Sequence, residues 1–215
     1  MNKKIKIIGL ILLFTYGICK ADSWAPYKMK EYYSENKEYK LVVTPQFTPK
    51  NYSDWIYFKK TTNIHNKVID RKRKKFFDAL TENDTVLIPC NGKLFHIIGT
   101  DTTLIWKRKL LNEISPVFAI VSNDGSSVVT FDNWFSNGYG GNVMVVYNEK
   151  GDAKKTYSLS DISPYPLNDY VTSISSIWWS AGAKYIDTDR IKIEFHTEKK
   201  DTTTRIYNAK LFVFE

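Results

Sequence analysis

The amino-acid sequence predicts an all-β protein, arranged as a small or incomplete β-propeller-like array of antiparallel hairpins with one inserted basic helix. Short segments rich in Val, Ile, Thr and aromatic residues recur along the chain and are separated by turn signals. Aromatic residues make up 15% of the 215 residues, which favours β structure or a binding surface. Two similar stretches also lie about two propeller-blade periods apart. A β-sandwich with a helical insertion is the alternative architecture.

The first 21 residues have the pattern of a secretory signal peptide. Lysines follow the initial residues, an apolar run of 12 residues occupies 7–18, and Ala21 is a small residue before a polar stretch. The run is short for a membrane span, which needs ~20 residues. We expect export to the periplasm or the medium, with residues 22–215 forming a single β-rich domain. A membrane anchor, or a lipid anchor at Cys19, is the less favoured alternative, because Ile18 stands where lipidation requires a small residue.

Removal of this segment would halve the formal charge. The full chain has 31 Lys and Arg against 23 Asp and Glu, a net charge of +8. Residues 1–21 hold four lysines and no acidic residue, so residues 22–215 carry +4, from 27 basic and 23 acidic side chains. Residues 50–75 alone hold nine basic and two acidic side chains. The charge therefore marks one basic segment, and for an exported chain it does not indicate a nucleic-acid partner.

After a polar and aromatic stretch at 22–37, strands dominate the pattern. They are short, β-branched or aromatic, and bounded by Gly, Asn and Asp, which is typical of antiparallel hairpins. The expected strands are 39–44, 55–58, 85–88, 94–98, 103–107, 117–121, 128–131, 143–147, 155–158, 191–195 and 205–214. The expected turns are 91–92, 123–125, 149–152 and 181–182.

One segment, residues 66–80, has helical rather than strand periodicity. Its apolar residues fall on one helix face at Ile69, Phe76, Phe77 and Leu80. Basic side chains fill much of the remainder: Arg71, Lys72, Arg73, Lys74 and Lys75. We expect a solvated basic face, and the alternative is weak contact with an anionic membrane surface.

A second, shorter helix is expected after the strand at 155–158. Ser158 and Asp161 have the spacing of a capping box, in which a serine and an acidic residue three positions later satisfy free backbone N–H groups. Pro164 and Pro166 predict that this helix ends after about one turn.

An internal match supports the repeated architecture. Residues 34–44 read SENKEYKLVVT and residues 122–130 read SNDGSSVVT, in each case a polar turn followed by a strand ending in Val-Val-Thr. Their ends lie 86 residues apart, which is two units of 43 and fits the ~40–45-residue period of propeller blades.

The densest stretch, residues 116–147, reads PVFAIVSNDGSSVVTFDNWFSNGYGGNVMVVY, and residues 173–179 read SISSIWW. With these motifs the chain resembles a group of uncharacterised exported bacterial proteins with β-propeller-like repeats. The resemblance covers roughly residues 104–190 and implies no activity. Phe135 departs from the pattern, because many relatives would have a histidine there.

The same stretch supplies the candidate ligand-binding residues. The Asp-Asn-Trp end of a strand leads into a Gly-rich loop at 137–141, and a Trp pair stands beside another turn. Exposed Trp and Tyr rings can stack on a sugar or anchor a protein contact, although Trp in small β domains commonly fills gaps between sheets. Neighbouring residues of a strand face opposite sides, so one ring of the Trp pair should be exposed. The candidates are Asp132, Asn133, Trp134, Tyr139, Trp178 and Trp179.

No catalytic, cofactor or metal motif emerges. The sequence has no Gly-x-Ser-x-Gly, His-Glu-x-x-His or P-loop pattern, and its three histidines lack ligand spacing. Cys90 is expected to be a half-buried apolar residue beside a turn. The favoured function is a non-catalytic binding module of the cell envelope or secretome, with an envelope protein or a glycan as partner. The alternatives are a glycan- or peptide-directed hydrolase using acids such as Asp132 and Asp187, and attachment to an anionic surface through 66–80.

Overall fold

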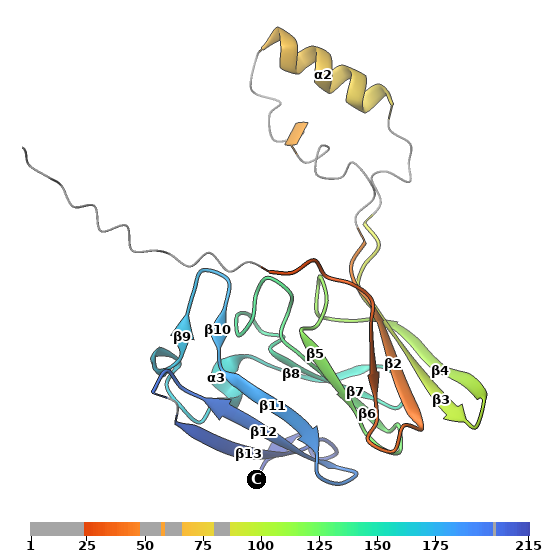
Figure 1. The fold of residues 1–215 in the computed structure, drawn as a ribbon, viewed down its shortest axis with the longest axis vertical. Coiled ribbons are helices and arrows are strands. Elements are labelled where there is room, and N and C mark those ends of the chain that lie inside the picture. The colour runs from red at the N-terminus through yellow and green to blue at the C-terminus, as the bar shows by residue number, and fades with distance from the viewer. Residues whose placement is uncertain (1–23, 48–56, 59–65, 80–86, 200) are drawn as a thin grey trace, which may run out of the picture.

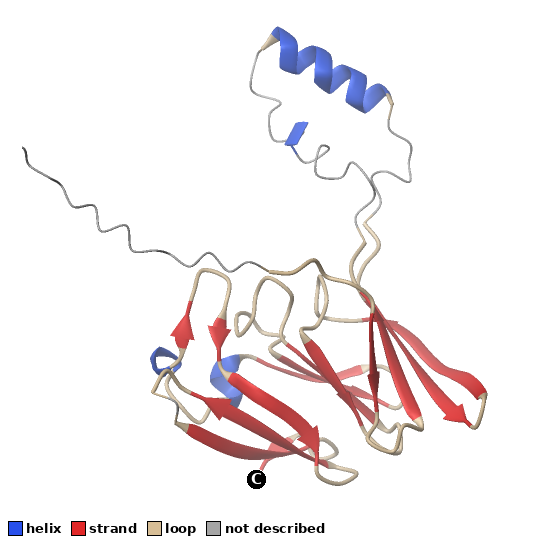
Figure 2. Cartoon of the chain, viewed as in Figure 1, coloured by secondary structure: helices blue, strands red, loops and turns tan. Residues whose placement is uncertain are grey.

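The computed structural model describes residues 24–47, 57–58, 66–79, 87–199 and 201–215. Three four-stranded antiparallel sheets and one two-stranded sheet form the framework of this part of the chain, so the all-β class is confirmed (Figure 2). Each four-stranded sheet is a meander, with strands neighbouring one another in chain order. The described strands form no closed sheet.

The strands are named in chain order (Figure 1). The first sheet contains β1 (Lys30–Tyr33), β2 (Tyr39–Thr44), β3 (Asn91–Ile98) and β4 (Asp101–Lys109). The second contains β5 (Phe118–Val121), β6 (Ser127–Phe131), β7 (Met144–Asn148) and β8 (Ala153–Tyr157). The third contains β11 (Ser180–Tyr185), β12 (Arg190–His196), β13 (Thr202–Asn208) and β14 (Val213–Phe214). The small sheet pairs β9 (Val171–Thr172) with β10 (Ile177–Trp178).

The second sheet lies between two hydrophobic cores. All five residues of β6 are buried, because successive side chains of a strand point to opposite faces and both faces are covered. Val128 packs with Leu41 and Leu94 of the first sheet. Val129 packs instead in a larger, aromatic-rich core with the third sheet. The unbroken burial of β6, which includes the polar Ser127 and Thr130, is therefore a consequence of packing on both sides.

Cys90 closes the first core and is more buried than the sequence suggested. Only 1% of its surface is exposed, and it precedes β3 directly, so its neighbour is a strand and not a turn. Burial raises the pKa of its thiol to about 12.

Two expected turns are wrong. Residues 91–92 begin β3, where Gly92 is buried and closely approached by Leu110 and Trp106. Residues 181–182 lie inside β11, at a bulge opposite β12 where Gly182 has φ 137°. Glycine is needed there because an L side chain rarely adopts that backbone conformation. At Gly182 the glycine does mark an unusual backbone conformation, but the chain does not reverse direction there.

Other expected strands changed at their ends. The strand expected at 205–214 stops at Asn208, whose side-chain oxygen accepts hydrogen bonds from the backbone N–H of Lys210 and Leu211 and so organises a turn before β14. The strand expected at 55–58 is not formed by Tyr57 and Phe58, which are helical, and 55–56 lie outside the described residues. Of 85–88, only the last two residues are described, and Ile88 forms an isolated antiparallel bridge with Phe47.

The two expected helices are present and differ in their environment. The short α3 (Leu159–Ile162) begins at the predicted capping box, where the backbone N–H of Ser158 donates to Asp161 at 2.8 Å. Both Leu159 and Ile162 are buried in the larger core, which holds this single turn against the sheets. A one-turn η2 (Leu167–Asp169) follows the two prolines.

The basic helix α2 (Lys67–Asp78) stands apart from the sheets in Figure 1. The side chain of Asn66 caps it by accepting hydrogen bonds from the N–H groups of Val68 and Ile69, and the helix has no buried residue. It ends two residues earlier than expected, at Asp78. Within the described part of the chain, no helix is long and apolar enough to cross a membrane.

The matching stretches at 34–44 and 122–130 are the first hairpin turn and second strand of two successive sheets. In each turn the leading serine hydroxyl accepts the N–H five residues on, and an Asn or Asp side chain accepts the N–H two residues on. These pairs are Ser34–Tyr39 and Asn36–Glu38 in the first turn, and Ser122–Ser127 and Asp124–Ser126 in the second. The next position is left-handed in both, with φ 61° at Lys37 and 69° at Gly125. The sequence match therefore corresponds to a repeated structural unit, but the two copies lie in successive sheets, so the 86 residues span one unit and not the two units of 43 that the spacing predicted.

Candidate functional site

A groove of about 910 Å³ lies between the second and third sheets, at the end where β6 leaves its sheet and β11 begins. Its volume is within the ~300–1,000 Å³ typical of small-ligand pockets. Four of the six candidate residues line it: Asp132, Trp134, Trp178 and Trp179. The first described residues, drawn in red in Figure 1, run over the same edge of the sheets and contribute Trp24 and Ala25 to the lining.

The Trp pair faces in two directions, as the strand alternation predicted. Trp179 is fully buried, with its ring 5.3 Å from that of Phe195 and 6.4 Å from that of Phe131. Trp178 is 39% exposed. One indole therefore belongs to the core beneath the groove, and the other is available at its surface.

Asp132 connects the groove to the core. It is 1% exposed and has φ 57°, and its Oδ1 accepts the N–H of Gly138 at 2.6 Å and the indole N–H of Trp179 at 3.1 Å. Burial raises the pKa of this carboxyl to about 7, although the two hydrogen bonds oppose the shift. The carboxyl thus fixes the Gly-rich loop and the buried Trp at once.

The loop after β6 is also joined to β10. The backbone N–H of Asn137 donates to the carbonyl of Ser175, and its own carbonyl accepts the N–H of Ile177 at 2.8 Å. Its side-chain amide donates to the carbonyl of Ile177 at 2.7 Å. The wall of the groove that carries Trp178 is therefore attached to the wall that carries Trp134.

Two candidates do not line the groove. Asn133 is used within the fold, because its side-chain oxygen accepts the N–H of Ile114 at 3.0 Å. Tyr139 is exposed, but its hydroxyl donates to the carbonyl of Ser173 at 2.8 Å and the ring is not part of the lining. Asp and Asn side chains that follow a strand commonly bind nearby backbone in this way.

The sequence did not single out Trp24 and Lys30. The Trp24 ring lies 5.4 Å from that of Trp134, and Lys30 Nζ lies 4.5 Å from the centroid of the Trp134 ring. Lys30 also donates to the carbonyl of Val117. Only the aromatic content of residues 22–37 hinted at this role.

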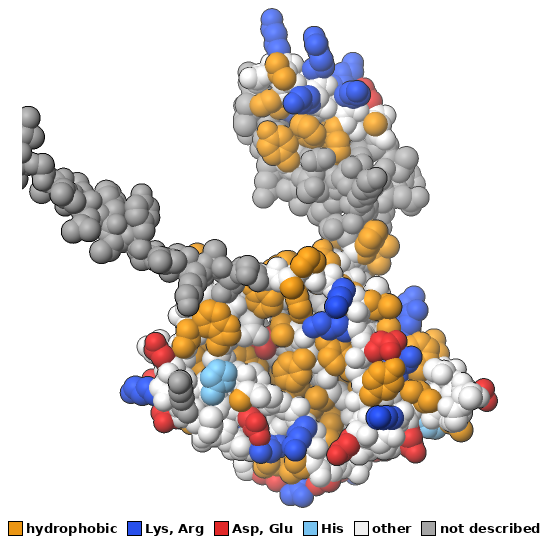
Figure 3. Space-filling view, viewed as in Figure 1, with side chains coloured by type: hydrophobic (Ala, Val, Ile, Leu, Met, Phe, Trp, Pro, Cys, Tyr) orange, Lys and Arg blue, Asp and Glu red, His pale blue; other side chains and the backbone are white. Residues whose placement is uncertain are grey.

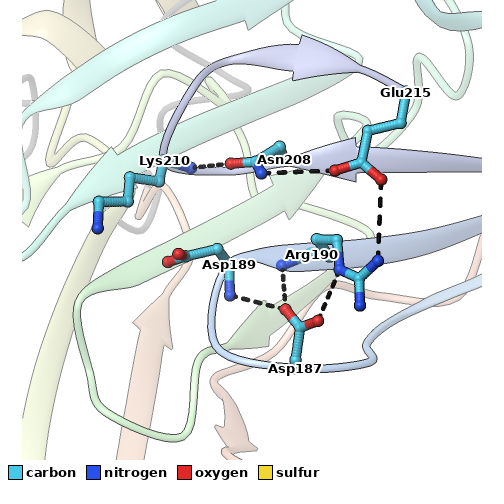
Figure 4. A network of polar contacts seen from close by, with 6 residues as sticks. All are labelled: Asp187, Asp189, Arg190, Asn208, Lys210 and Glu215. Atoms are coloured by element: carbon cyan, nitrogen blue, oxygen red, sulfur yellow. Dashed lines mark hydrogen bonds and ion pairs between the residues drawn. The ribbon is translucent and has the colours of Figure 1, made fainter.

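The structure does not bring together the two acids considered for a hydrolase. Asp187 lies in the exposed turn between β11 and β12, where it accepts the N–H groups of Asp189 and Arg190 and forms an ion pair with the Arg190 side chain at 2.6 Å (Figure 4). The hydrogen bond from Arg190 holds the pKa of this carboxyl below its usual range. Arg190 also reaches Glu215 at 3.9 Å, so these charged groups tie a turn to the end of the chain.

The described residues contain no group of three or more His, Cys, Asp or Glu side chains placed to hold a metal ion. His96 stacks on Tyr39 at 4.7 Å between centroids, and His65 lies outside the described residues.

The basic candidates occupy the surface of α2, where Lys and Arg side chains gather in Figure 3. Arg73 is partly buried and forms an ion pair with Asp70 at 3.3 Å. The other four are exposed: Arg71, Lys72, Lys74 and Lys75. The groove and this helix surface are thus separate candidate sites of different chemistry.

A scan against protein-family models and a search of curated proteins found no match to this chain.

Proposed function

We propose that the protein is a non-catalytic binding module that is exported to the cell envelope or the medium. Its ligand binds in the groove lined by Trp24, Trp134, Trp178 and Trp179, called here the tryptophan groove. The observation that carries the proposal is the presence of Trp134 and Trp178 on walls that backbone hydrogen bonds hold together. Indole rings at concave sites provide large contact areas with one polar N–H, and such rings dominate many binding sites. An envelope protein or a glycan is the partner class.

Export is part of the proposal and is supported by the pattern of residues 1–21. A basic start, a short apolar run and a small residue at position 21 are the features of a cleaved leader. The mass of the protein recovered from the periplasm or the medium tests this point. Cleavage after Ala21 is expected, and full-length protein confined to the cytoplasm would contradict it.

A propeller-like relation between the sheets also belongs to the proposal. Three successive meanders follow the chain, and their first strands are neighbours, since β5 contacts both β1 and β11. Inner strands in contact and a repeated first turn are features of propeller blades.

Binding to a glycan array and to an array of envelope-protein peptides tests the function. Wild-type protein is expected to bind members of one array, and Trp178→Ala should weaken that binding by about tenfold or more, as for the removal of a ring that anchors a contact. Tyr33→Ala is the matched control, because it removes an exposed ring from β1, outside the groove lining. Equal binding by all three proteins, or silence on both arrays, would overturn the proposal.

A second candidate function, attachment to an anionic surface, is favoured by the exposed charges of α2. Four exposed cations lie within five residues of a helix that has no buried residue. Co-sedimentation with phosphatidylglycerol vesicles should be lost when Arg71, Lys72, Lys74 and Lys75 are replaced by Gln, and in ~1 M salt, where charge is screened. Binding that persists in such salt would show that the attraction is not electrostatic. The structure gives the hydrolase alternative no support at its two suggested acids, because Asp132 is buried at the groove and Asp187 lies in an exposed turn.

A further inference from the structure

A short segment of the chain lies along the tryptophan groove and covers part of its aromatic wall. Residues 24–27 read Trp-Ala-Pro-Tyr and form neither helix nor strand. The ring of Trp24 packs against Trp134 at 5.4 Å and Phe135 at 5.7 Å, and its indole N–H donates to the hydroxyl of Ser175 at 3.0 Å. Tyr27 follows on the same surface, 6.1 Å from the ring of Phe135. The aromatic side chains of this segment are thus recognised by aromatic rings and one polar group.

The backbone of the segment is recognised as well. The indole N–H of Trp134 donates to the carbonyl of Ala25 at 3.0 Å. Ala25 precedes Pro26, and a residue before proline is restricted to extended or polyproline conformations. Proline-containing peptides are commonly recognised by aromatic-lined grooves, because their backbone is already extended and loses little entropy on binding. The contact of Trp134 with the carbonyl before Pro26 has these two features.

We propose that the groove is a peptide-binding site whose resident occupant is the chain's own segment 24–27. In trans it takes extended peptides that carry an aromatic residue two positions before a proline. The inference rests on the proposed function, because it assigns a ligand class to the same groove. A glycan ligand is the competing outcome.

The resident segment is held weakly enough to be displaced. No residue from 24 to 29 is buried, and the segment makes few hydrogen bonds to the groove. The firm attachment begins at Lys30, where β1 starts and the ammonium group contacts Trp134 and Val117. Segments with little buried surface open at low free-energy cost. A free peptide therefore competes with the chain's own segment for the same site. The apparent affinity for the free peptide equals the intrinsic affinity multiplied by the fraction of molecules whose own segment has left the site.

The experiment measures the fluorescence anisotropy of a labelled peptide with the sequence of residues 22–28, DSWAPYK. The peptide is titrated with the protein expressed from the complete sequence and purified in the form that the cell produces. Trp24→Ala removes the resident ring and is expected to bind the peptide about tenfold more tightly than wild type. Adding Trp134→Phe to Trp24→Ala, which deletes the indole N–H and keeps a ring, should weaken binding by about fivefold. Peptides with Trp or Pro replaced by Ala, and a scrambled peptide, should bind more weakly than DSWAPYK.

A folded Trp24→Ala protein that does not bind the peptide, or that binds the scrambled peptide equally well, would overturn the inference. If Trp24→Ala does not fold, Tyr27→Ala provides the same measurement, because it loosens the resident segment by removing its ring from Phe135 and leaves the groove residues unchanged. The same proteins on the glycan array separate the two proposals. Glycan binding without peptide binding would refute the peptide site and leave the binding module, whereas silence towards both would refute both.

Discussion

The tryptophan groove and the basic helix α2 are both candidate sites, yet they relate to the fold in opposite ways. Trp179 beneath the groove is fully buried and bonded to Asp132, so the site and the core share residues. The helix α2 has no buried residue, and its N-terminus is capped by the side chain of Asn66. The geometry of the groove therefore depends on the same packing that stabilises the sheets, whereas the charges of α2 are arranged by local helix formation alone.

The largest expected effect is on stability in the groove. Trp179→Ala should lower the free energy of unfolding by about 3–5 kcal/mol, because it leaves a cavity in the core and removes a hydrogen-bond donor from buried Asp132. Trp178→Ala should cost under about 1 kcal/mol, because its ring is partly in solvent. Urea denaturation of the two variants measures the difference, and similar losses would mean that the two rings do not divide the roles of core and surface.

A smaller effect concerns pH and the carboxyl of Asp132. Its pKa of about 7 in the folded protein exceeds the unfolded value, so the folded state holds the proton more tightly and this group's contribution to stability falls as pH rises from about 4 to about 7. The slope reaches at most ~1.4 kcal/mol per pH unit. Asp132→Asn keeps an oxygen to accept the N–H groups of Gly138 and Trp179 and does not ionise.

The free energy of unfolding of Asp132→Asn minus that of wild type isolates this group from the other carboxyls. The difference should increase between pH 4 and 7 and become constant above that range. A difference that is constant over the whole range would show that Asp132 does not titrate near neutrality.

The smallest expected effect lies at α2 and tests the other side of the comparison. Asn66→Ala removes the N-cap and should destabilise the helix by about 1 kcal/mol, while global unfolding changes by less than about 0.5 kcal/mol because no residue of α2 is buried. Amide hydrogen exchange at Val68 and Ile69 reports the local loss. Asp161→Ala is the matched control, because α3 buries Leu159 and Ile162 and its cap should affect global stability. A large global effect of Asn66→Ala would contradict the separation.

Much of the fold could be predicted because strands and turns are coded locally. Short runs of β-branched and aromatic residues located nine of the longer strands, and Ser158 with Asp161 predicted α3. The first strand β1, Lys-Glu-Tyr-Tyr, was missed because its charged residues hide the pattern and only pairing with β2 fixes it. The glycine at 182 was misassigned because a bulge and a turn need the same backbone freedom, and the partner strand decides between them.

The part of the site that depends on local strand structure could also be predicted. Alternation along a strand correctly gave one buried and one exposed ring for the pair at 178–179. The contributions of Trp24 and of the buried Asp132 carboxyl could not be derived, since they depend on contacts between residues 151 and 47 positions apart in the chain. Long-range packing of this kind leaves no periodic signal.

The buried thiol of Cys90 is a natural probe of how often the first core opens. With its pKa near 12 and 1% of its surface exposed, it offers almost no thiolate to an alkylating reagent while the first core is closed. Labelling by a maleimide therefore requires the first core to open around Cys90, and at reagent concentrations where labelling outpaces reclosing its rate equals the rate of that opening. Mass spectrometry of native protein incubated with the reagent would thus measure the opening of the first core without an engineered probe.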